Sequence, residues 1–220
     1  MADVVVPTEA FVALIADVVK SSEIPDRLSF QSFLEVAIQR ANARFRSVVT
    51  SRFVVTLGDE FQALLSGPEA LFEIVDLFEA NLPGVQLRYG IGLGRLSTAL
   101  KPDAVGMDGP CFHMARDAVT QAKRETASIV VHGIDDSWSQ WVNATLGLIS
   151  ALRGRRTELM RQTVYEAKYG EGGQRGVAQR RGVDESTVSK CLQAACYRTV
   201  CRGEDAAISM MVECFRRLSD

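Results

Sequence analysis

The chain has 220 residues and a formal net charge of -2, with 47% hydrophobic and 24% charged residues. This composition is typical of a soluble globular protein of one or two domains, and it argues against a disordered or collagen-like chain. No apolar stretch reaches the ~18 residues that span a bilayer, and no basic segment precedes an apolar run at the N-terminus. Five cysteines without paired CxxC spacing favour reduced thiols. We therefore expect a cytoplasmic protein with no membrane partner.

Charge is unevenly distributed along the chain. Residues 150–202 carry 11 Lys and Arg against 5 Asp and Glu, whereas the rest of the chain carries 14 against 22. An acidic body with a basic C-terminal segment is the asymmetry expected when only that segment meets a polyanion such as DNA.

The acidic body is predicted to alternate between strands and helices. Apolar runs rich in β-branched residues predict strands, and apolar residues at helical spacing predict helices. In chain order the predicted elements are a strand at 11–19, a helix at 29–45, a hairpin of two strands within 47–66, a helix at 68–84, a strand at 86–98, a helix at 110–125 and a strand at 127–133. The order contains a split βαβ unit. The sequence therefore predicts an α+β fold with a ferredoxin-like, mainly antiparallel sheet covered by helices on one face.

The basic segment is predicted to be entirely helical. Its sequence "QRGVAQRRGVDESTVSKCLQAACYR", residues 174–198, has the pattern of a helix-turn-helix, with Gly182 in the turn and Val183 as its apolar plug. Residues 155–170 supply a third helix, and residues 204–218 form a last amphipathic helix. The expected division is a nucleotide-binding domain at 1–134, a linker helix at 135–153 and an all-α trihelical helix-turn-helix domain at 154–220.

The second helix of this unit is predicted to present short polar and basic side chains to a DNA groove, with arginines flanking the backbone. The predicted DNA-binding residues are Arg175, Arg180, Arg181, Ser186, Thr187, Ser189, Lys190 and Gln193. The alternative is a helical hairpin used for dimerisation, with its arginines solvated.

Three carboxylates are candidate metal ligands. Asp17 lies near the end of the first predicted strand, and Asp59 and Glu60 lie at the tip of the predicted hairpin. The first strand of a split βαβ sheet lies beside a strand of the hairpin, so these carboxylates are expected to converge at one edge. Converging carboxylates repel one another unless a cation joins them, and such oxygen ligands suit Mg²⁺ or Mn²⁺ completed by substrate phosphates. A Gly-Asp turn is also a common structural device, and Asp17 could equally cap a helix.

Candidate phosphate-binding residues follow or precede these acids. Lys20 adds a positive charge after Asp17, and the hydroxyls and amides of Ser21 and Ser22 could face a phosphate. Gly58, before Asp59, would let a ribose or phosphate approach the backbone closely.

The two acidic segments together resemble those of known enzymes. The stretch "IADVVKSS", followed some forty residues later by "LGDEFQALL", is similar to the metal-binding segments of class III nucleotidyl cyclases and GGDEF diguanylate cyclases. The resemblance implies that Asp17 and Asp59 bind two metal ions, Mg²⁺ or Mn²⁺. It also implies that the peptide carbonyl of Val18 and the carboxylate of Glu60 assist them, and that the site forms across a homodimer.

The resemblance extends to the third predicted helix. The stretch "ARDAVTQAK", residues 115–123, resembles a GGDEF helix whose lysine contacts phosphates, and Lys123 is the matching position. Arg116 would help Lys123 to neutralise phosphate charge. Class III enzymes carry an asparagine and, four residues on, an arginine on the helix after the glycine strand. Here the nearest residues are His113 and Arg116, which argues against cyclisation of a single nucleotide more than against metal–nucleotide binding.

Taken as a whole, the chain is identified as a member of the SatD family. The segments "ADVVKSS", "GDEFQ" and "GMDGP" with the following Phe112, Ala115 and Arg116 occur in one chain with a C-terminal helix pair that resembles a DNA-binding unit. This order of segments implies a cyclase-like palm linked to a helix-turn-helix in bacterial signalling or stress regulation.

The residues leave three functional hypotheses open. The first is a metal-dependent nucleotidyl cyclase or nucleotidyltransferase-type palm coupled to DNA binding. The second is a catalytically inactive transcriptional regulator that senses a nucleotide. The third is a DNA-binding or scaffold protein whose palm only dimerises, and the presence of both Asp17 and Asp59 weighs against it. The first two share a nucleoside triphosphate as ligand.

Overall fold

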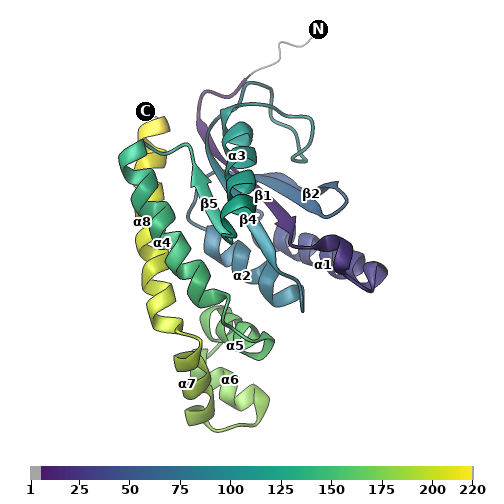
Figure 1. The fold of residues 1–220 in the computed structure, drawn as a ribbon, viewed down its shortest axis with the longest axis vertical. Helices are drawn as coiled ribbons and strands as arrows, with labels where there is room; N and C mark the ends of the chain where they lie inside the picture. Colours follow the sequence, from purple (N-terminus) through teal and green to yellow (C-terminus); the bar gives the residue numbers. More distant parts are fainter. Residues whose placement is uncertain (1–5, 220) are drawn as a thin grey trace.

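The computed structural model describes residues 6–219, except for the side chains of residues 57, 136, 137 and 219. Within this range the chain forms one five-stranded sheet and eight α-helices (Figure 1). The strands are β1 (Ala10–Val18), β2 (Val49–Leu57), β3 (Glu60–Leu65), β4 (Leu87–Arg95) and β5 (Ile129–His132). The helices are α1 (Arg27–Arg44), α2 (Leu71–Asn81), α3 (Pro110–Glu125), α4 (Asp136–Arg153), α5 (Glu158–Tyr169), α6 (Gly173–Arg181), α7 (Glu185–Ala194) and α8 (Tyr197–Ser219).

The predicted order of strands and helices along residues 10–132 is confirmed, and the strands form a single sheet. Its strand order is β2-β3-β1-β4-β5. Strand β1 pairs antiparallel with β3 and with β4, whereas β4 and β5 are parallel. The first strand is therefore central, and the hairpin of β2 and β3 lies beside it, as the carboxylate argument requires.

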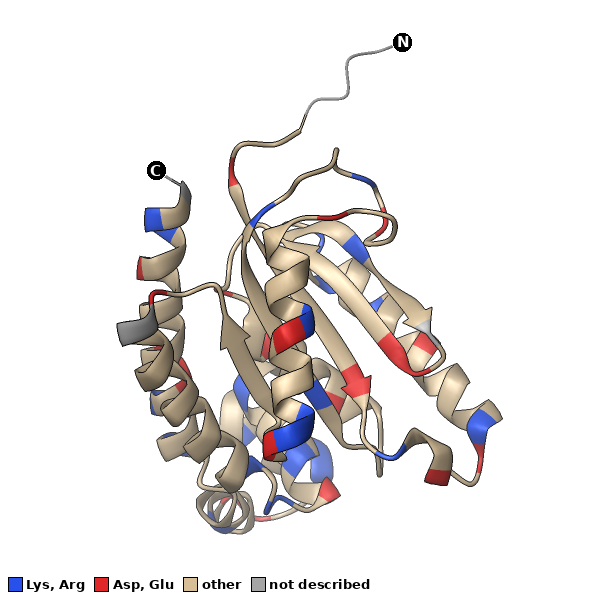
Figure 2. Cartoon of the chain, turned by 45° about the horizontal axis from the view of Figure 1, so that its top comes forward, with Lys and Arg blue, Asp and Glu red and all other residues tan. Residues whose placement is uncertain are grey.

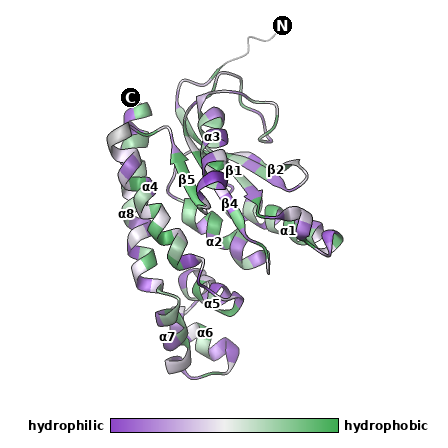
Figure 3. Cartoon of the chain, in the orientation of Figure 1, coloured by the Kyte–Doolittle hydropathy of each residue, from purple (hydrophilic) through white to green (hydrophobic). Residues whose placement is uncertain are grey.

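Helices cover both faces of the sheet, which corrects the prediction that they share one face. Alternate residues of β1, such as Val12 and Leu14, join the core formed with α1 and α2. The intervening residues, such as Ala13 and Ile15, join a second core formed with α3. Every residue of β1 is buried, so its continuous apolar run needs cover on both sides. Figure 3 shows the hydrophobic colouring of β5, the strand at one edge of the sheet.

Helix α3 lies unusually close to β4 because of the glycines in that strand. A Cβ on Gly92 would lie 2.0 Å from the carbonyl oxygen of Cys111, and one on Gly90 would lie 2.3 Å from that of Ala115. Neither glycine can therefore carry a side chain without moving α3. The "YGIGLG" strand fixes the height of α3 above the sheet, and with it the position of the basic residues on that helix.

Helices α4 and α8 pack against each other and against the main core. Ile149 of α4 and Met211 of α8 belong to the same buried cluster as the strands. Asn143 of α4 also exchanges two hydrogen bonds, both 2.9 Å, with the backbone of Val131 in β5. Helix α8 begins at Tyr197, seven residues before the last helix predicted from the sequence. Helix α8 thus packs in the main core of the sheet domain and also contacts α7 of the C-terminal helices.

Helices α5, α6 and α7 form a small core of their own below the sheet (Figure 1). Val177, Val188 and Leu192 are buried in it, as predicted. Gly182 has a φ of +62° and makes the turn between α6 and α7. Val183, the predicted apolar plug, is instead 42% exposed. That prediction is wrong because Val183 contributes through its backbone N–H, which donates to the carbonyl of Ala178 and ends α6.

A buried ion cluster joins α4, α5 and α8 to α2. Arg153 of α4 pairs with Asp76 of α2 and with Glu204 of α8, each at 2.5 Å. Lys168 of α5 pairs with the same two acids, and the hydroxyl of Tyr169 donates to Asp76 at 2.7 Å. Burial alone would raise the pKa of Asp76, but Arg153 and Lys168 outweigh it and hold the pKa below its ordinary value. Burial opposes the charged forms of both cations, yet the surrounding acids raise their pKa values.

Candidate functional site

The predicted carboxylates meet at one edge of the sheet. Asp17, near the end of β1, lies in register opposite Glu60 of β3 on one side and Arg88 of β4 on the other. Residues paired across neighbouring strands point to the same face, which here is the face covered by α3. Asp17 is 9% exposed and Glu60 is 6% exposed. Two nearly buried carboxylates therefore lie side by side, as the sequence predicted.

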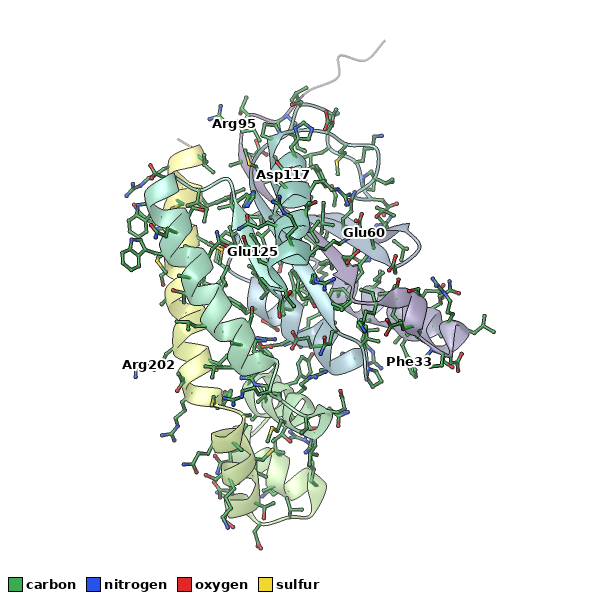
Figure 4. The ribbon with its side chains drawn as sticks, viewed as in Figure 1. Phe33, Glu60, Arg95, Asp117, Glu125 and Arg202 are labelled. Atoms are coloured by element: carbon green, nitrogen blue, oxygen red, sulfur yellow. The ribbon has the colours of Figure 1, made fainter. Side chains whose placement is uncertain are left out.

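Helix α3 supplies one cation to each carboxylate. The Nζ of Lys123 lies 2.8 Å from Oδ1 of Asp17. Arg116 pairs with both oxygens of Glu60, with Nη2 at 2.9 Å from Oε1. The two cations are seven residues apart, close to two helical turns, so they lie on one face of α3. Figure 2 shows the acidic bands of the strands beside the basic bands of this helix, and Figure 4 marks Glu60 next to it.

Arg88 is a third cation at this edge, and the sequence analysis did not identify it. Its Nη1 lies 3.9 Å from Oδ2 of Asp17, and its side chain is 20% exposed. The sequence did contain a clue to Arg88. If the first strand pairs antiparallel with the glycine strand, a residue of "QLRYG" lies opposite Asp17. Finding it required the register, which single-sequence reasoning does not supply.

The hairpin tip is open. Gly58 has a φ of +58°, and a Cβ built there would meet nothing within 4 Å. Asp59 is partly exposed, and its side chain makes no hydrogen bond or ion pair with the described part of the chain. Thr56, across the turn, donates to Oε1 of Glu60 at 2.9 Å. Asp59 is thus the carboxylate whose oxygens are free for a ligand.

The loop after β1, which was predicted to face a phosphate, contains a left-handed residue followed by a short 3₁₀-helix. Val18 is buried and lies opposite Leu87 of β4. Lys20 adopts a left-handed conformation with a φ of 54° and pairs with Glu23 at 3.1 Å. Ser21 and Ser22 lie with Glu23 in a short 3₁₀-helix. The hydroxyls of both serines are free of hydrogen bonds to the described residues.

The donor set fits a divalent cation that arrives with its phosphates better than a metal caged by protein alone. The part of the chain that is described holds no group of three or more His, Cys, Asp or Glu residues that could hold a metal. Asp17 is paired with Lys123 and Glu60 with Arg116, whereas Asp59 has no described partner. Mg²⁺ is typically bound by one or two carboxylates together with substrate phosphates and waters, rather than by an all-protein cage. The carboxylates of Asp17 and Glu60, next to Lys123, Arg88 and Arg116, match that pattern.

The C-terminal candidate residues divide into two groups. The polar residues predicted to face DNA are all exposed on α7; they are Ser186, Thr187, Ser189, Lys190 and Gln193. Of the arginines, Arg175 is exposed and Arg181 is held inside the unit, bonding Glu166 at 2.6 Å and Thr163 at 2.8 Å. Arg180 is exposed but donates to the carbonyl of Glu171.

Fold and site together define an α+β protein with paired carboxylates and cations at one edge of its sheet. The chain belongs to the SatD family, whose sequence model matches residues 11–211. A comparison with curated proteins found no match. In the part of the chain that the structure describes, no helix has both the length and the apolar character needed to cross a membrane.

Two solved structures show distant likenesses. The catalytic core of a rhodopsin-guanylyl cyclase with converted specificity, in complex with ATPαS, is 14% identical, with a TM-score of 0.42 over 55% of this chain and 76% of that chain. A bacterial light-regulated adenylyl cyclase is 11% identical, with a TM-score of 0.41 over 56% of this chain and 75% of that one.

Proposed function

We propose that the carboxylate edge of the sheet binds a nucleoside triphosphate together with Mg²⁺ or Mn²⁺. The observation that supports this most is the matched pairing of Asp17 with Lys123 and of Glu60 with Arg116 at an edge that remains open at Gly58. Ion pairs with an exposed partner contribute little to stability, so they can exchange partners at small cost. A metal–triphosphate offers both halves of that exchange, a cation for the carboxylates and oxyanions for the basic side chains.

Each residue of the site has a role in this proposal. Asp17, Asp59 and the peptide carbonyl of Val18 would hold the metal, while Glu60 positions Arg116. Lys123 and Arg116 would bind phosphate oxygens and neutralise their charge. Gly58, Lys20 and the two serines after it would line the approach of the phosphates. When bound, the metal polarises a phosphoryl oxygen and stabilises the charge that develops on it.

The palm is further proposed to be cyclase-like, with a ferredoxin-like core, and to work as a homodimer. A nucleotidyl cyclase or nucleotidyltransferase would use Asp17, Asp59 and Lys123 as its catalytic residues. A nucleotide sensor without turnover is the second candidate, and one observation favours it. His113 bonds Asp108 at 2.7 Å, so it does not stand free in the place of the asparagine of the class III asparagine–arginine pair.

The C-terminal helices are proposed to bind DNA as a helix-turn-helix. Support comes from the glycine turn at Gly182, from the separate small core of α5 to α7, and from the exposed polar face of α7. Short polar and basic side chains on such a helix can reach phosphates and base edges in a major groove. The buried ion cluster would connect this unit to the nucleotide-binding body.

The test is incubation of the purified protein with ATP, GTP, CTP or UTP in the presence of Mn²⁺ or Mg²⁺. Products are resolved by mass spectrometry and the melting temperature is followed in parallel, with Asp59→Ala as the control. A cyclic or oligonucleotide product that disappears in the control supports the enzyme. Stabilisation without turnover, lost in the control, supports the sensor. Neither turnover nor stabilisation with any of the four nucleotides contradicts the proposal.

A further inference from the structure

A cavity of about 480 Å³ lies next to the carboxylate edge. It is bounded by the first residues of β4 and β5, by the turn between α3 and β5, and by the C-terminal half of α4. Apolar residues such as Val85 and Ile129 form part of the lining, and Ser128 and Asn143 add polar groups. Such a mixture of apolar walls and a few polar groups is characteristic of small-molecule sites.

Two buried polar atoms in the lining are without partners. The Oγ of Ser150 and the Nε of Arg153 are each buried and make no hydrogen bond to any described residue. Ser150 is 8% exposed and Arg153 is 5% exposed. Buried polar groups in folded proteins are nearly always hydrogen-bonded, so each unsatisfied one needs an explanation. Both residues line the cavity, but these two atoms have almost no exposed surface and lie behind its wall.

Gly147 is an exposed residue of α4 in the lining of the cavity. It lies inside α4, where glycine is unfavourable relative to alanine because of its backbone entropy. Packing does not require it, since a Cβ at this position would meet nothing within 4 Å. Gly147 lines the cavity, and a larger side chain there would occupy it.

The cavity and the carboxylate site share one residue, Arg88. Arg88 lines the cavity and also faces Asp17, 3.9 Å away. Val19, two residues after Asp17, and Thr126, three residues after Lys123, line it as well. The path from Asp17 on β1 across β4 to the start of β5 is two strand spacings, about 10 Å. A nucleotide bound at Asp17 by its phosphates would therefore reach the cavity with its base.

We propose that this cavity binds the nucleoside end of the nucleoside triphosphate. The inference rests on the proposed function, because it takes the carboxylate edge as the phosphate site. The base would lie between the apolar walls with its polar edge toward Ser128. Arg153 of the lining holds Asp76 and Glu204 in the buried ion cluster, so an occupied cavity contacts the link to the C-terminal helices.

The test uses a substitution that fills the cavity without removing any charge or hydrogen bond. Gly147→Leu places a side chain in open space and should favour the helix, so the variant is expected to fold. The matched control is Ala144→Leu, which adds the same side chain to an exposed position of α4 outside the lining. Affinities for ATP, GTP, CTP, UTP and inorganic tripolyphosphate are measured with Mg²⁺ by isothermal titration for wild type and both variants.

Gly147→Leu is expected to weaken binding of the preferred nucleoside triphosphate at least tenfold and to leave the affinity for tripolyphosphate unchanged. Ala144→Leu is expected to change neither. An affinity of Gly147→Leu for the nucleotide within twofold of wild type overturns the inference and leaves the proposed function standing. If wild-type protein binds no nucleotide at all, the proposed function fails and the inference fails with it.

Photolabelling locates the base directly. An 8-azido purine triphosphate bound to wild-type protein with Mg²⁺ is expected to label peptides from α4 or from the turn between α3 and β5. Labelling confined to other segments contradicts the placement of the base in this cavity.

Discussion

Acidic and basic side chains are paired in two places in this protein, and the two places differ in their access to water. In the buried cluster, the side chains of Arg153 and Asp76 are 4% and 5% exposed. At the sheet edge the acids are also shielded, but the side chains of Lys123 and Arg116 are 45% and 47% exposed. Breaking a buried pair leaves an uncompensated charge, whereas an exposed cation can leave its partner and be solvated. The buried pairs therefore fix the structure, and the pairs at the edge can exchange for a ligand.

The largest effect is expected from Arg153→Met. This change leaves Lys168 as the one cation partner that Asp76 and Glu204 share among the described residues, and removal of one partner of a buried pair typically costs about 3–5 kcal/mol. Urea unfolding monitored by circular dichroism should show a loss of this size. The control is Arg52→Ala, which removes an exposed ion pair with Asp103 and should change stability by less than about 1 kcal/mol. Equal losses of unfolding free energy in the two variants would contradict the distinction between buried and exposed ion pairs.

The pH dependence of stability should show which acid the cluster depends on. The pKa of Asp76 is held below its ordinary value of 3.8, so its ionised form stabilises the folded state. That stabilisation is present above about pH 4 and is lost as the pH falls through the lowered pKa. Asp76→Asn lacks this contribution at every pH. The difference in unfolding free energy between wild type and Asp76→Asn should therefore shrink below pH 4, and a difference that grows there would contradict the assignment.

At the sheet edge, a charge-removing substitution should affect binding more than stability. Asp17→Asn is expected to weaken binding of the metal-bound nucleotide at least tenfold, or about 1.4 kcal/mol. Its urea midpoint should move little, because Lys123 can turn to solvent. Titration calorimetry and urea unfolding on the same preparation separate the two effects. A large loss of stability with unchanged nucleotide affinity would show that Asp17 is a structural residue.

The smallest effect is expected from an exposed cation that has no acidic partner. Lys190 of α7 is exposed and makes no ion pair with any described residue. If α7 meets DNA, Lys190→Ala should weaken binding about equally for all sequences and reduce the salt-dependence slope by about 1. Fluorescence anisotropy with a labelled duplex at several salt concentrations measures this slope. Arg217→Ala, on α8 and paired with Glu213, is the control, and equal slopes for the two variants would count against α7 as the DNA-facing helix.

Much of the fold was predictable because local patterns and packing agree. The continuous apolar run that became β1, the hairpin at Gly58 and the amphipathic helix from Pro110 to Glu125 all appear where the sequence predicted them. The sequence did not predict that helices cover both faces of the sheet. The apolar run of β1, interrupted only by Asp17, does not say that two different layers cover it. The close packing of α3 on the glycines of β4 became visible only in the folded chain.

The candidate site was predicted only in part. Asp17 and Glu60 were expected to converge, and they do, because residue types and strand order suffice for that conclusion. Arg88 was missed, and the pairing of Lys20 with Glu23 was not foreseen, because both depend on register or on loop conformation. The buried cluster around Arg153 could not be read from the sequence either, since its members come from α2, α4, α5 and α8 and meet only in the folded chain.

The most direct test of the central claim is titration of wild-type protein with its preferred nucleoside triphosphate in Mg²⁺ and again in excess EDTA. The claim is that carboxylates at the sheet edge exchange their basic partners for a metal-bound triphosphate. It predicts at least tenfold tighter binding in Mg²⁺, and the loss of that difference in Asp17→Asn. Equal affinity of the wild-type protein in Mg²⁺ and in EDTA would contradict it.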